Sequence, residues 1–441
     1  MLKFVCQFKV YLKTLRKFLG KVFSMDNIFY IGAEILGILI FLGICFAMSK
    51  KKKDIPWLSV GILVALNIAI ALFFLNTPIG QSAVTAASDG FSLLISGAQE
   101  GIAFAFGTSL TNYADNSAVF FASALLPVLV IVPLFDILTY FGILPWIIKI
   151  IGKAIAFITR TPKFESFFAI EMMFLGNTEA IAASRFQILK LSKERILTVA
   201  MMSMSCISAA LVGSYTSMMP GAYVLTAIPL NVINALLVAT IMNPYKLDKS
   251  EDEIATLYKK GEKKEPFFSY LGNSILGSGK LVLIICANVI AFVGLAAVIN
   301  IILGAFNPLI HNFVNWDLSL QNLFGLIMYI PAVLLGLPIG APETMEMAQS
   351  MGTKLVTNEF VVMGNLQPIL DSFNSEHFKC VVTIFLTSFA NFSTIGMIVG
   401  CFQGMVGEDK NKHIAKNILY MFVAGILVSC LSAGIAGLFV W

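Results

Sequence analysis

"FLGNTEAIAASR", residues 174–185, places an amide, a hydroxyl and a carboxylate directly after an apolar run. The chain around this stretch is oily, because 58% of its 441 residues are hydrophobic and only 12% are charged. In soluble domains, about a quarter of all residues are charged. The composition therefore predicts a membrane protein, in which the carboxylate of Glu179 requires an explanation.

Eight apolar stretches have about the 20 residues that a membrane helix needs. They cover residues 28–48, 56–75, 117–143, 196–218, 222–242, 281–304, 380–402 and 417–440. The fold class predicted from them is an all-α polytopic membrane protein with eight transmembrane helices. We expect residues 76–116 to be a loop on one side of the membrane and residues 243–280 to be a hydrophilic loop on the other.

The positions of the basic residues predict the orientation. Lys and Arg cluster in segments that would share one side, namely 50–53, 149–163, 246–280 and 410–416, whereas residues 76–116 contain neither. Positive loops mark the cytoplasmic side, so both termini should lie outside. Residues 1–24 carry six positive charges and should not cross. Our hypothesis is that they are an extension and that translation begins at Met25. Because the basic residues flank spans, we expect no nucleic-acid partner.

The order of parts repeats along the chain. Residues 25–143 hold three scaffold spans, residues 144–242 form a first repeat, residues 281–304 hold a sixth span, and residues 313–441 form a second repeat. Each repeat has an interfacial helix, an apolar stretch with a polar interruption, and two spans. Each interrupted stretch has the length of a re-entrant helical hairpin, and the two start from opposite sides. Inverted repeats with interrupted helices are typical of secondary transporters, whose sites lie where the repeats meet.

Carboxylates inside the membrane are the strongest functional signal, because an ionised acid there costs roughly 3 kcal/mol on insertion scales. Glu179 and Glu359 occupy matching places in the two interruptions. We expect no Lys or Arg close enough to neutralise them, which favours binding of a polar solute over a structural ion pair. Glu171 is a further acid on the first hairpin and a candidate proton carrier. Asn391, an amide in mid-span, predicts a local break in its helix.

Two other classes of protein compete with a carrier. An intramembrane enzyme acting on a polar or lipid substrate would need paired metal ligands or a nucleophile beside a base. The sequence has no such cluster, no phosphate loop and no dinucleotide fingerprint, so we expect no enzyme and no cofactor. A channel would not require two hairpins with different polar tips. Saturable, competitively inhibited uptake separates a carrier from a channel, and a chemically altered product would indicate an enzyme.

Six motifs resemble one known family, the concentrative nucleoside transporters. They are "LNTPIG" (75–80), "GNTEA" (176–180), "LVGSY" (211–215), "NPY" (243–245), "KLVTNEFV" (354–361) and "FANFSTIG" (389–396). The resemblance implies a homotrimer in the bacterial cytoplasmic membrane, in contact with lipid. It implies that the hairpins and the spans after them form a transport domain that moves past a scaffold, and that a cation gradient drives nucleoside import.

The resemblance also implies a substrate site. Asn177, Thr178 and Glu179 match the hairpin tip that binds the base, with Leu211 and Phe389 beside it. The ribose hydroxyls would meet Glu359, Asn391 and Thr394. Asn177 stands where the family often has Gln, and Thr394 where it often has Ser. The shorter Asn leaves more room beside the base, which favours purine nucleosides.

The family's sodium site is matched poorly. The family holds the ion with an Asn side chain, here Met172, with a backbone carbonyl, here that of Leu175, and with two residues of the broken fourth span, here Cys206 and Ile207. A thioether and a thiol are poor ligands for a hard cation, which prefers oxygen. We therefore predict coupling to H+ rather than Na+, with Glu179, Glu359 or Glu171 as the titrating group. A carboxylate in a desolvated site can hold its proton near physiological pH. The alternative is a sodium-coupled symporter of pyrimidine nucleosides.

Overall fold

The computed structural model describes residues 25–108, 119–247, 252, 265–310, 317–403 and 405–441. This part of the chain is helical and contains no strand. Its α-helices are α2 (Met25–Ala47), α3 (Trp57–Asn76), α4 (Pro78–Phe106), α5 (Val128–Tyr140), α6 (Ile143–Thr159), α7 (Lys163–Leu175), α8 (Asn177–Ala183), α9 (Arg185–Ile188), α10 (Lys193–Ser203), α11 (Ala209–Thr216), α12 (Gly221–Met242), α13 (Phe267–Gly304), α14 (Asn307–Ile310), α15 (Leu320–Leu334), α16 (Pro342–Val356), α17 (Glu359–Leu366), α18 (Glu376–Leu386), α19 (Phe392–Gln403), α20 (Glu408–Lys416) and α21 (Ile418–Gly437). The expected extension, residues 1–24, lies outside the described residues.

Six of the described helical segments are long and apolar enough to cross a membrane. They cover Asn27–Ala47, Trp57–Asn76, Phe121–Tyr140, Gly221–Met242, Phe267–Gly304 and Ile418–Gly437. Helices α12 and α21 are buried over most of their length and form the centre of the molecule, whereas few residues of α13 are buried. An apolar helix with an exposed surface is suited to contact lipid or another protein.

The two remaining expected spans are broken in the middle. Residues 196–218 contain the end of α10 at Ser203 and the start of α11 at Ala209. Residues 380–402 contain the end of α18 at Leu386 and the start of α19 at Phe392. The predicted break near Asn391 is therefore confirmed. Each break frees backbone groups that a continuous helix would use internally.

Our expectation of a loop over residues 76–116 is wrong for most of its length. Helix α4 occupies Pro78–Phe106, starts with proline in its first turn and is capped by Thr77, whose hydroxyl accepts from the amide of Gly80 at 3.0 Å. It ends at Gly107, whose φ is +84°. Helix α13 also starts at Phe267, well before residue 281, where we expected the sixth span to start.

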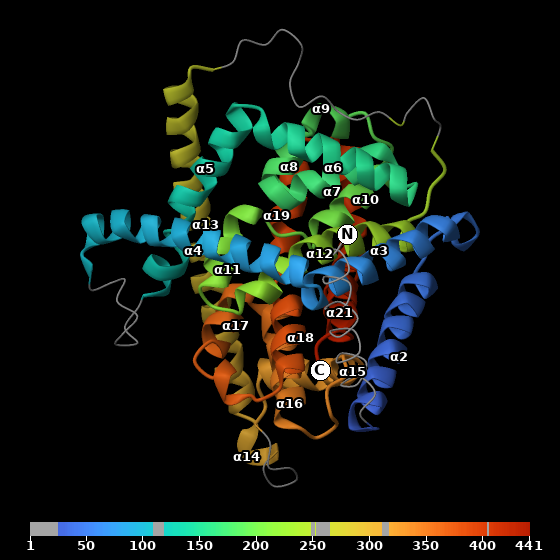
Figure 1. Cartoon of the computed structure of the whole chain (residues 1–441). Helices are drawn as coiled ribbons and strands as arrows, with labels where there is room; N and C mark the ends of the chain where they lie inside the picture. Colours follow the sequence, from blue (N-terminus) through green and yellow to red (C-terminus); the bar gives the residue numbers. More distant parts are fainter. Residues whose placement is uncertain (1–24, 109–118, 248–251, 253–264, 311–316, 404) are drawn as a thin grey trace, which may run out of the picture.

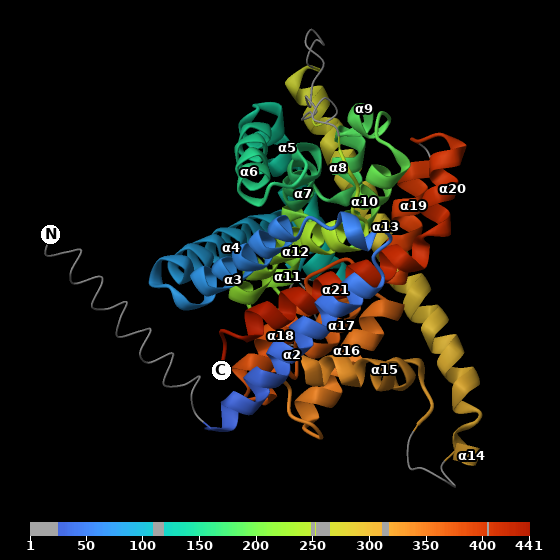
Figure 2. The ribbon, with the colours of Figure 1, turned by 90° about the vertical axis from the view of Figure 1, so that its right-hand side faces the viewer.

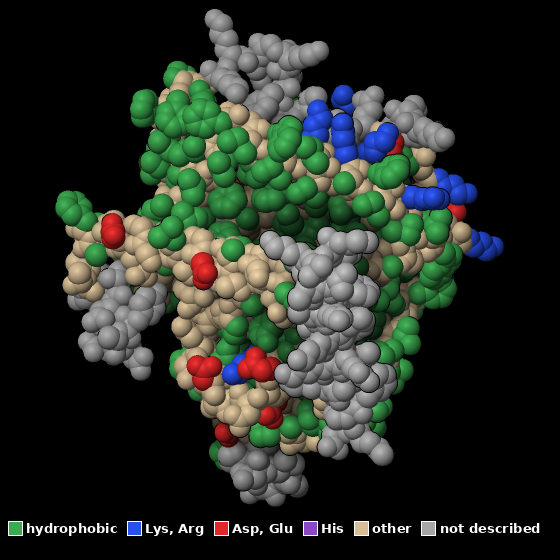
Figure 3. Space-filling view, viewed as in Figure 1, with side chains coloured by type: hydrophobic (Ala, Val, Ile, Leu, Met, Phe, Trp, Pro, Cys, Tyr) green, Lys and Arg blue, Asp and Glu red, His purple; other side chains and the backbone are tan. Residues whose placement is uncertain are grey.

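Figures 1 and 2 show how the helices are arranged. Helices α5 to α9 lie at one end of the molecule and α14 to α18 at the other, with α3, α4, α12 and α21 between them. Helix α13 runs along one side from end to end, and the start of α2 lies at the same end as α15. On the face drawn in Figure 3, most Lys and Arg side chains gather at the end with α6 and α9 and along the side next to it.

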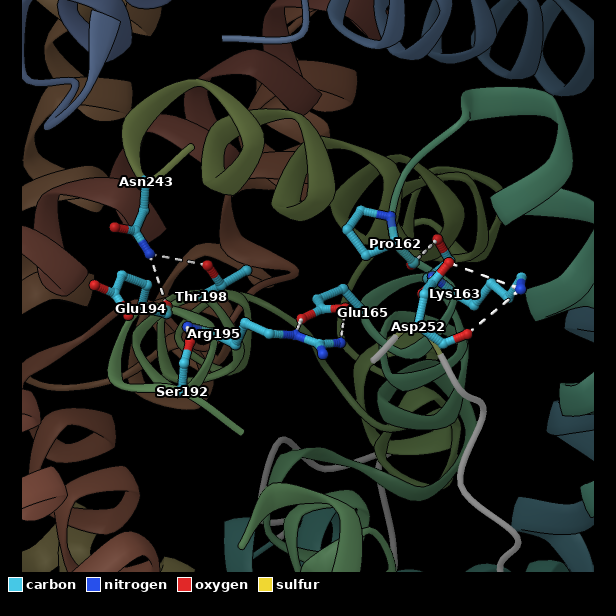
Figure 4. A network of polar contacts seen from close by, with 10 residues as sticks. Pro162, Lys163, Glu165, Ser192, Glu194, Arg195, Thr198, Asn243 and Asp252 are labelled. Carbon is cyan, nitrogen blue, oxygen red and sulfur yellow. Dashed lines mark hydrogen bonds and ion pairs between the residues drawn. The ribbon is translucent and has the colours of Figure 1, made fainter. Parts of the chain in front are cut away.

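A buried polar network connects the first turns of α7 and α10 (Figure 4). The guanidinium of Arg195 donates two hydrogen bonds to the carboxylate of Glu165, at 2.7 and 2.9 Å. The amide of Asn243, at the end of α12, donates to the backbone carbonyl of Glu194 at 2.8 Å and to the hydroxyl of Thr198 at 3.0 Å. The network ties three helices together at the end from which α7 leads to its polar tip.

Candidate functional site

The first polar tip joins α7 to α8 at Gly176, whose φ is +99°. A Cβ at this position would lie 2.9 Å from the Glu179 carboxylate and 3.1 Å from Ser208 Cβ, so both the dihedral and the space require glycine. Asn177 follows and is 2% exposed. Its side-chain amide donates to the carbonyl of Ser203 at 3.1 Å, which fastens the tip to the α10 side of the first helix break.

The rest of the first tip presents its polar atoms to an open space. The side-chain oxygen of Asn177 accepts from the backbone N–H of Thr178 at 2.9 Å. The hydroxyl of Thr178 donates to the carboxylate of Glu179 at 2.6 Å. Because Thr178 occupies only one carboxylate oxygen of Glu179, the other can bind a ligand.

The second polar tip joins α16 to α17 through Thr357 and Asn358. Asn358 caps α17, since its side-chain oxygen accepts from the amide of Val361 at 3.0 Å. Glu359, the first residue of α17, is 2% exposed. A carboxylate at a helix N-terminus is stabilised by the helix dipole.

Glu359 has two neutral donors. The hydroxyl of Tyr215 donates to one carboxylate oxygen at 2.9 Å, and the amide of Asn391 donates to the other at 3.1 Å. Asn391 is in turn held by Thr394, whose backbone N–H and hydroxyl donate to its side-chain oxygen at 2.9 and 3.1 Å. The hydroxyl of Thr394 also reaches the carbonyl of Phe389 at 2.5 Å. Tip and helix break therefore form one connected polar group.

One cavity lies between the two tips and the two helix breaks. Every substrate residue expected from the sequence lines it: Asn177, Thr178, Glu179, Leu211, Glu359, Phe389, Asn391 and Thr394. These residues come from four separate segments of the chain. The structure thus brings together, in one cavity, the two acids that the sequence placed in matching positions.

The opposite wall of the cavity was not expected. It consists of α5 and α13 residues, Val132, Phe135, Asp136, Leu281, Ile284, Ile285 and Asn288. Most are apolar, but Asp136 and Asn288 add polar atoms, and Asp136 accepts from the hydroxyl of Ser274 at 2.5 Å. In the sequence, Asp136 and Asn288 stand out because each is an isolated polar residue in an apolar span.

The positions that match the family's sodium site offer little to a hard cation. Met172, Cys206 and Ile207 are buried, and Leu175 is half-buried at the edge of the cavity. The hydroxyl of Ser203 donates to the sulfur of Met172 at 3.4 Å. The side chains of Met172 and Cys206 carry sulfur where Na+ prefers oxygen, whereas the position of Leu175 would contribute only its backbone carbonyl.

Glu171 lies apart from the substrate cavity. It is fully buried on α7, and one of its carboxylate oxygens accepts from the hydroxyl of Ser184 at 2.6 Å. The other oxygen has no hydrogen-bond partner among the described residues. Of the three candidate proton carriers, only Glu179 and Glu359 face the cavity.

The expectation that no basic residue lies near the two acids is wrong for Glu359. Lys354, five positions earlier, is fully buried, and its ammonium and the carboxylate of Glu359 interact electrostatically. Lys354 lies in the motif "KLVTNEFV", but nothing in its local sequence indicates that its side chain is buried beside Glu359.

Family models match the chain in two places. A model described as "Na+ dependent nucleoside transporter N-terminus" matches residues 36–109, and one described as "Na+ dependent nucleoside transporter C-terminus" matches residues 223–437. The purine nucleoside transport protein NupG of Bacillus subtilis is 46% identical over 412 residues, which are 93% of this chain and 100% of that protein. The nucleoside permease NupC of Helicobacter pylori is 27% identical, over 92% of this chain and 97% of that protein.

Solved structures share the fold. The structure of CNTnw in an inward-facing substrate-bound state has a TM-score of 0.83 and 24% sequence identity, and the match covers 93% of this chain and 98% of that one. A CNTnw variant in an outward-facing state has a TM-score of 0.85 at 25% identity, covering 93% and 99%.

Proposed function

This chain belongs to the concentrative nucleoside transporter family, and on that premise we propose that it is a proton-coupled symporter that imports nucleosides and prefers purine nucleosides. It is a multi-pass membrane transporter and not an enzyme. The observation that carries the proposal is the single cavity in which both polar tips and both helix breaks meet.

The second tip provides the ribose site. Glu359 and Asn391 form a fixed acceptor and donor pair 3.1 Å apart, and Thr394 holds the amide of Asn391 in place. A carboxylate accepts hydrogen bonds from neighbouring hydroxyls more strongly than a neutral oxygen does. The 2′ and 3′ hydroxyls of a ribose are the ligand that suits this pair.

The first tip provides the base site. Thr178 and Glu179 supply the polar atoms, while Leu211 and Phe389 supply the apolar surface against which a flat ring can pack. Asn177 lines the cavity, but its amide donates to Ser203 and its oxygen accepts from Thr178, so these polar atoms are occupied within the protein. The space that remains favours the larger purine ring, in keeping with the name of the Bacillus subtilis relative.

Protons rather than sodium ions drive this transport. The side chains at the sodium positions, Met172, Leu175, Cys206 and Ile207, carry no oxygen, although the matching family models are described as sodium dependent. Glu179 is the carboxylate best suited to take up a proton, because its one side-chain partner in the structure is the hydroxyl of Thr178. Glu359, by contrast, is held as an acceptor by two donors.

We further propose the membrane arrangement. The six long helices and the two broken helices make eight crossings, and α7–α8 and α16–α17 are re-entrant hairpins of inverted repeats. The opposite locations of α6–α7 and α15–α16 in Figure 1 support this arrangement. The end of the molecule where Lys and Arg gather in Figure 3 faces the cytoplasm. Both termini therefore lie on the outer side of the cytoplasmic membrane.

The exposed helix α13 is the surface for assembly. Its most apolar window is only 11% buried in the protomer, and it also forms one wall of the substrate cavity. We assign it to the scaffold of a homotrimer, past which the two tips and the broken helices move as a transport domain.

Uptake by proteoliposomes tests the ion and the base. The purified protein is supplied with radiolabelled inosine under an inward pH gradient or an inward sodium gradient, each alone. We expect accumulation with the pH gradient and stronger competition by inosine than by uridine. Uptake that follows sodium and ignores pH would overturn the proton assignment, and a strong pyrimidine preference would overturn the base assignment.

A further inference from the structure

A buried lysine lies behind the ribose site. Lys354, in the last turn of α16, is 0% exposed. Its ammonium donates to the carbonyl of Phe385 at 2.6 Å and to the hydroxyl of Ser388 at 2.5 Å, and it lies 4.5 Å from the centre of the Phe385 ring. Two oxygen acceptors and the face of an aromatic ring therefore surround the ammonium, and each is a favourable neighbour for a positive charge.

The acceptors of Lys354 lie at the second helix break. Phe385 belongs to the last turn of α18, where carbonyl groups lose their helical partners and the helix dipole is negative. Ser388 continues the contact to α21, since its hydroxyl and that of Ser429 are 2.6 Å apart. The lysine therefore joins α16, the helix break and α21 at one point.

The break held by Lys354 carries part of the substrate site. Phe389 and Asn391, the cavity residues of this segment, follow Ser388 directly. On its own side of the tip, Lys354 precedes Glu359, and the two charges interact inside the protein. Besides Glu359, the titratable groups in this region are Tyr215 on α11 and Cys430 on α21.

Within the part of the chain that the structure describes, no lysine donates a hydrogen bond to the first helix break. The corresponding segment, from Ser203 to Ala209, faces Met172 and carries Cys206, and its polar contact from the tip comes from the neutral amide of Asn177. Broken membrane helices present carbonyl oxygens that suit a bound cation. At the second break, a side chain of the protein supplies that cation.

We propose that Lys354 is a tethered cation and a positioning residue for nucleoside binding, which fixes the second helix break and keeps the carboxylate of Glu359 ionised for the ribose hydroxyls. This proposal rests on the proposed function of Glu359 and Asn391 as nucleoside ligands. It adds that binding depends on a charge that does not touch the substrate and does not exchange with solution.

The test is nucleoside affinity as a function of pH for Lys354→Met in detergent, with inosine as the ligand. We expect affinity to fall by about 10-fold to 100-fold, the loss expected for a charged hydrogen-bonding group. We also expect the acid limb of the affinity profile to move to higher pH, because a carboxylate without a nearby ammonium takes up its proton more readily. In the Glu359→Gln background the same substitution should cost less affinity than in the wild type, because the part of its effect that acts through the carboxylate is already lost.

Two further variants separate charge from packing. Lys354→Arg retains the charge, so the acid limb of its affinity profile should lie at the same pH as in the wild type, even if its affinity falls. This variant also tests the proposal if Lys354→Met fails to fold. Lys149→Met removes an exposed lysine on α6 and should change neither property. A wild-type pH profile in Lys354→Met, an acid limb displaced equally in Lys354→Arg, or additive losses in the double variant would overturn the proposal. If the wild type itself binds no nucleoside, the proposed function fails as well.

Discussion

The carboxylate of Glu359 and the amide of Asn391 meet at 3.1 Å, although one begins helix α17 and the other lies in the break before α19. This contact joins a tip to a broken helix across the cavity. It also leaves lone pairs of the carboxylate for a ligand, since Tyr215 and Asn391 each use one.

Glu359→Gln should reduce inosine affinity by about 10-fold to 100-fold, because a charged acceptor is replaced by an amide with one acceptor oxygen. The new NH2 group would also face one of the two donors, Tyr215 or Asn391, in place of an acceptor oxygen. Equilibrium binding in detergent measures the effect. Glu343→Gln, on α16 and away from the cavity, is the matched control and should bind as the wild type does. Equal affinity in both variants would exclude Glu359 as a ligand.

Gly176→Ala should abolish most transport while the protein still folds. The backbone of Gly176, with φ +99° and ψ 169°, costs a non-glycine residue about 1–3 kcal/mol, and the new Cβ would lie 2.9 Å from the Glu179 carboxylate. The tip must therefore shift. Gly364→Ala, which has open space around it and a position within α17, serves as the control. Normal uptake by Gly176→Ala would mean that the shape of the first tip does not matter.

Arg195→Met should destabilise the protein by about 3–5 kcal/mol, because it leaves the carboxylate of Glu165 buried without its partner. Thermal unfolding in detergent measures the loss. Replacing both residues, as Arg195→Met with Glu165→Met, should recover much of it. Asp409→Asn breaks an exposed pair with Lys193 and should leave the melting temperature almost unchanged. A stable Arg195→Met variant would show that the pair contributes little.

Asn177→Gln should narrow the base site and shift selectivity toward pyrimidines. The added methylene cannot keep both the Ser203 contact and the Thr178 contact, so the amide moves toward the cavity. The ratio of inosine to uridine inhibition constants, measured by competition in the same preparation, should fall several-fold, as expected for a change of one methylene. An unchanged ratio would indicate that Asn177 does not set the base preference.

The break near Asn391 could be predicted from the sequence for a physical reason. Amides and small hydroxyl residues in mid-span cannot pack as hydrocarbon does, and Asn391 therefore marked its own break. Glu179 and Glu359 were equally visible, since an acid in an apolar stretch is costly. That the two acids share one cavity could be predicted only from the inverted order of the two repeats.

The residues that support the site could not be predicted in the same way. Tyr215 contacts Glu359 from a helix 144 positions away in sequence, and no local pattern indicates that pairing. The ammonium of Lys354 is buried against the end of α18, 31 positions later in sequence, and no local pattern indicates that contact either. Helix α4 was missed because its Ser, Thr and Ala residues give little hydrophobic signal despite good caps.

Concentrative uptake tests the central claim most directly. Proteoliposomes containing the purified protein are given a low external concentration of radiolabelled inosine and an inward pH gradient. We predict that inosine accumulates above its external concentration, that unlabelled purine nucleosides inhibit this uptake, and that a protonophore abolishes it. Inosine that only equilibrates, or that enters no faster than into empty liposomes under any imposed ion gradient, would contradict nucleoside symport through this cavity.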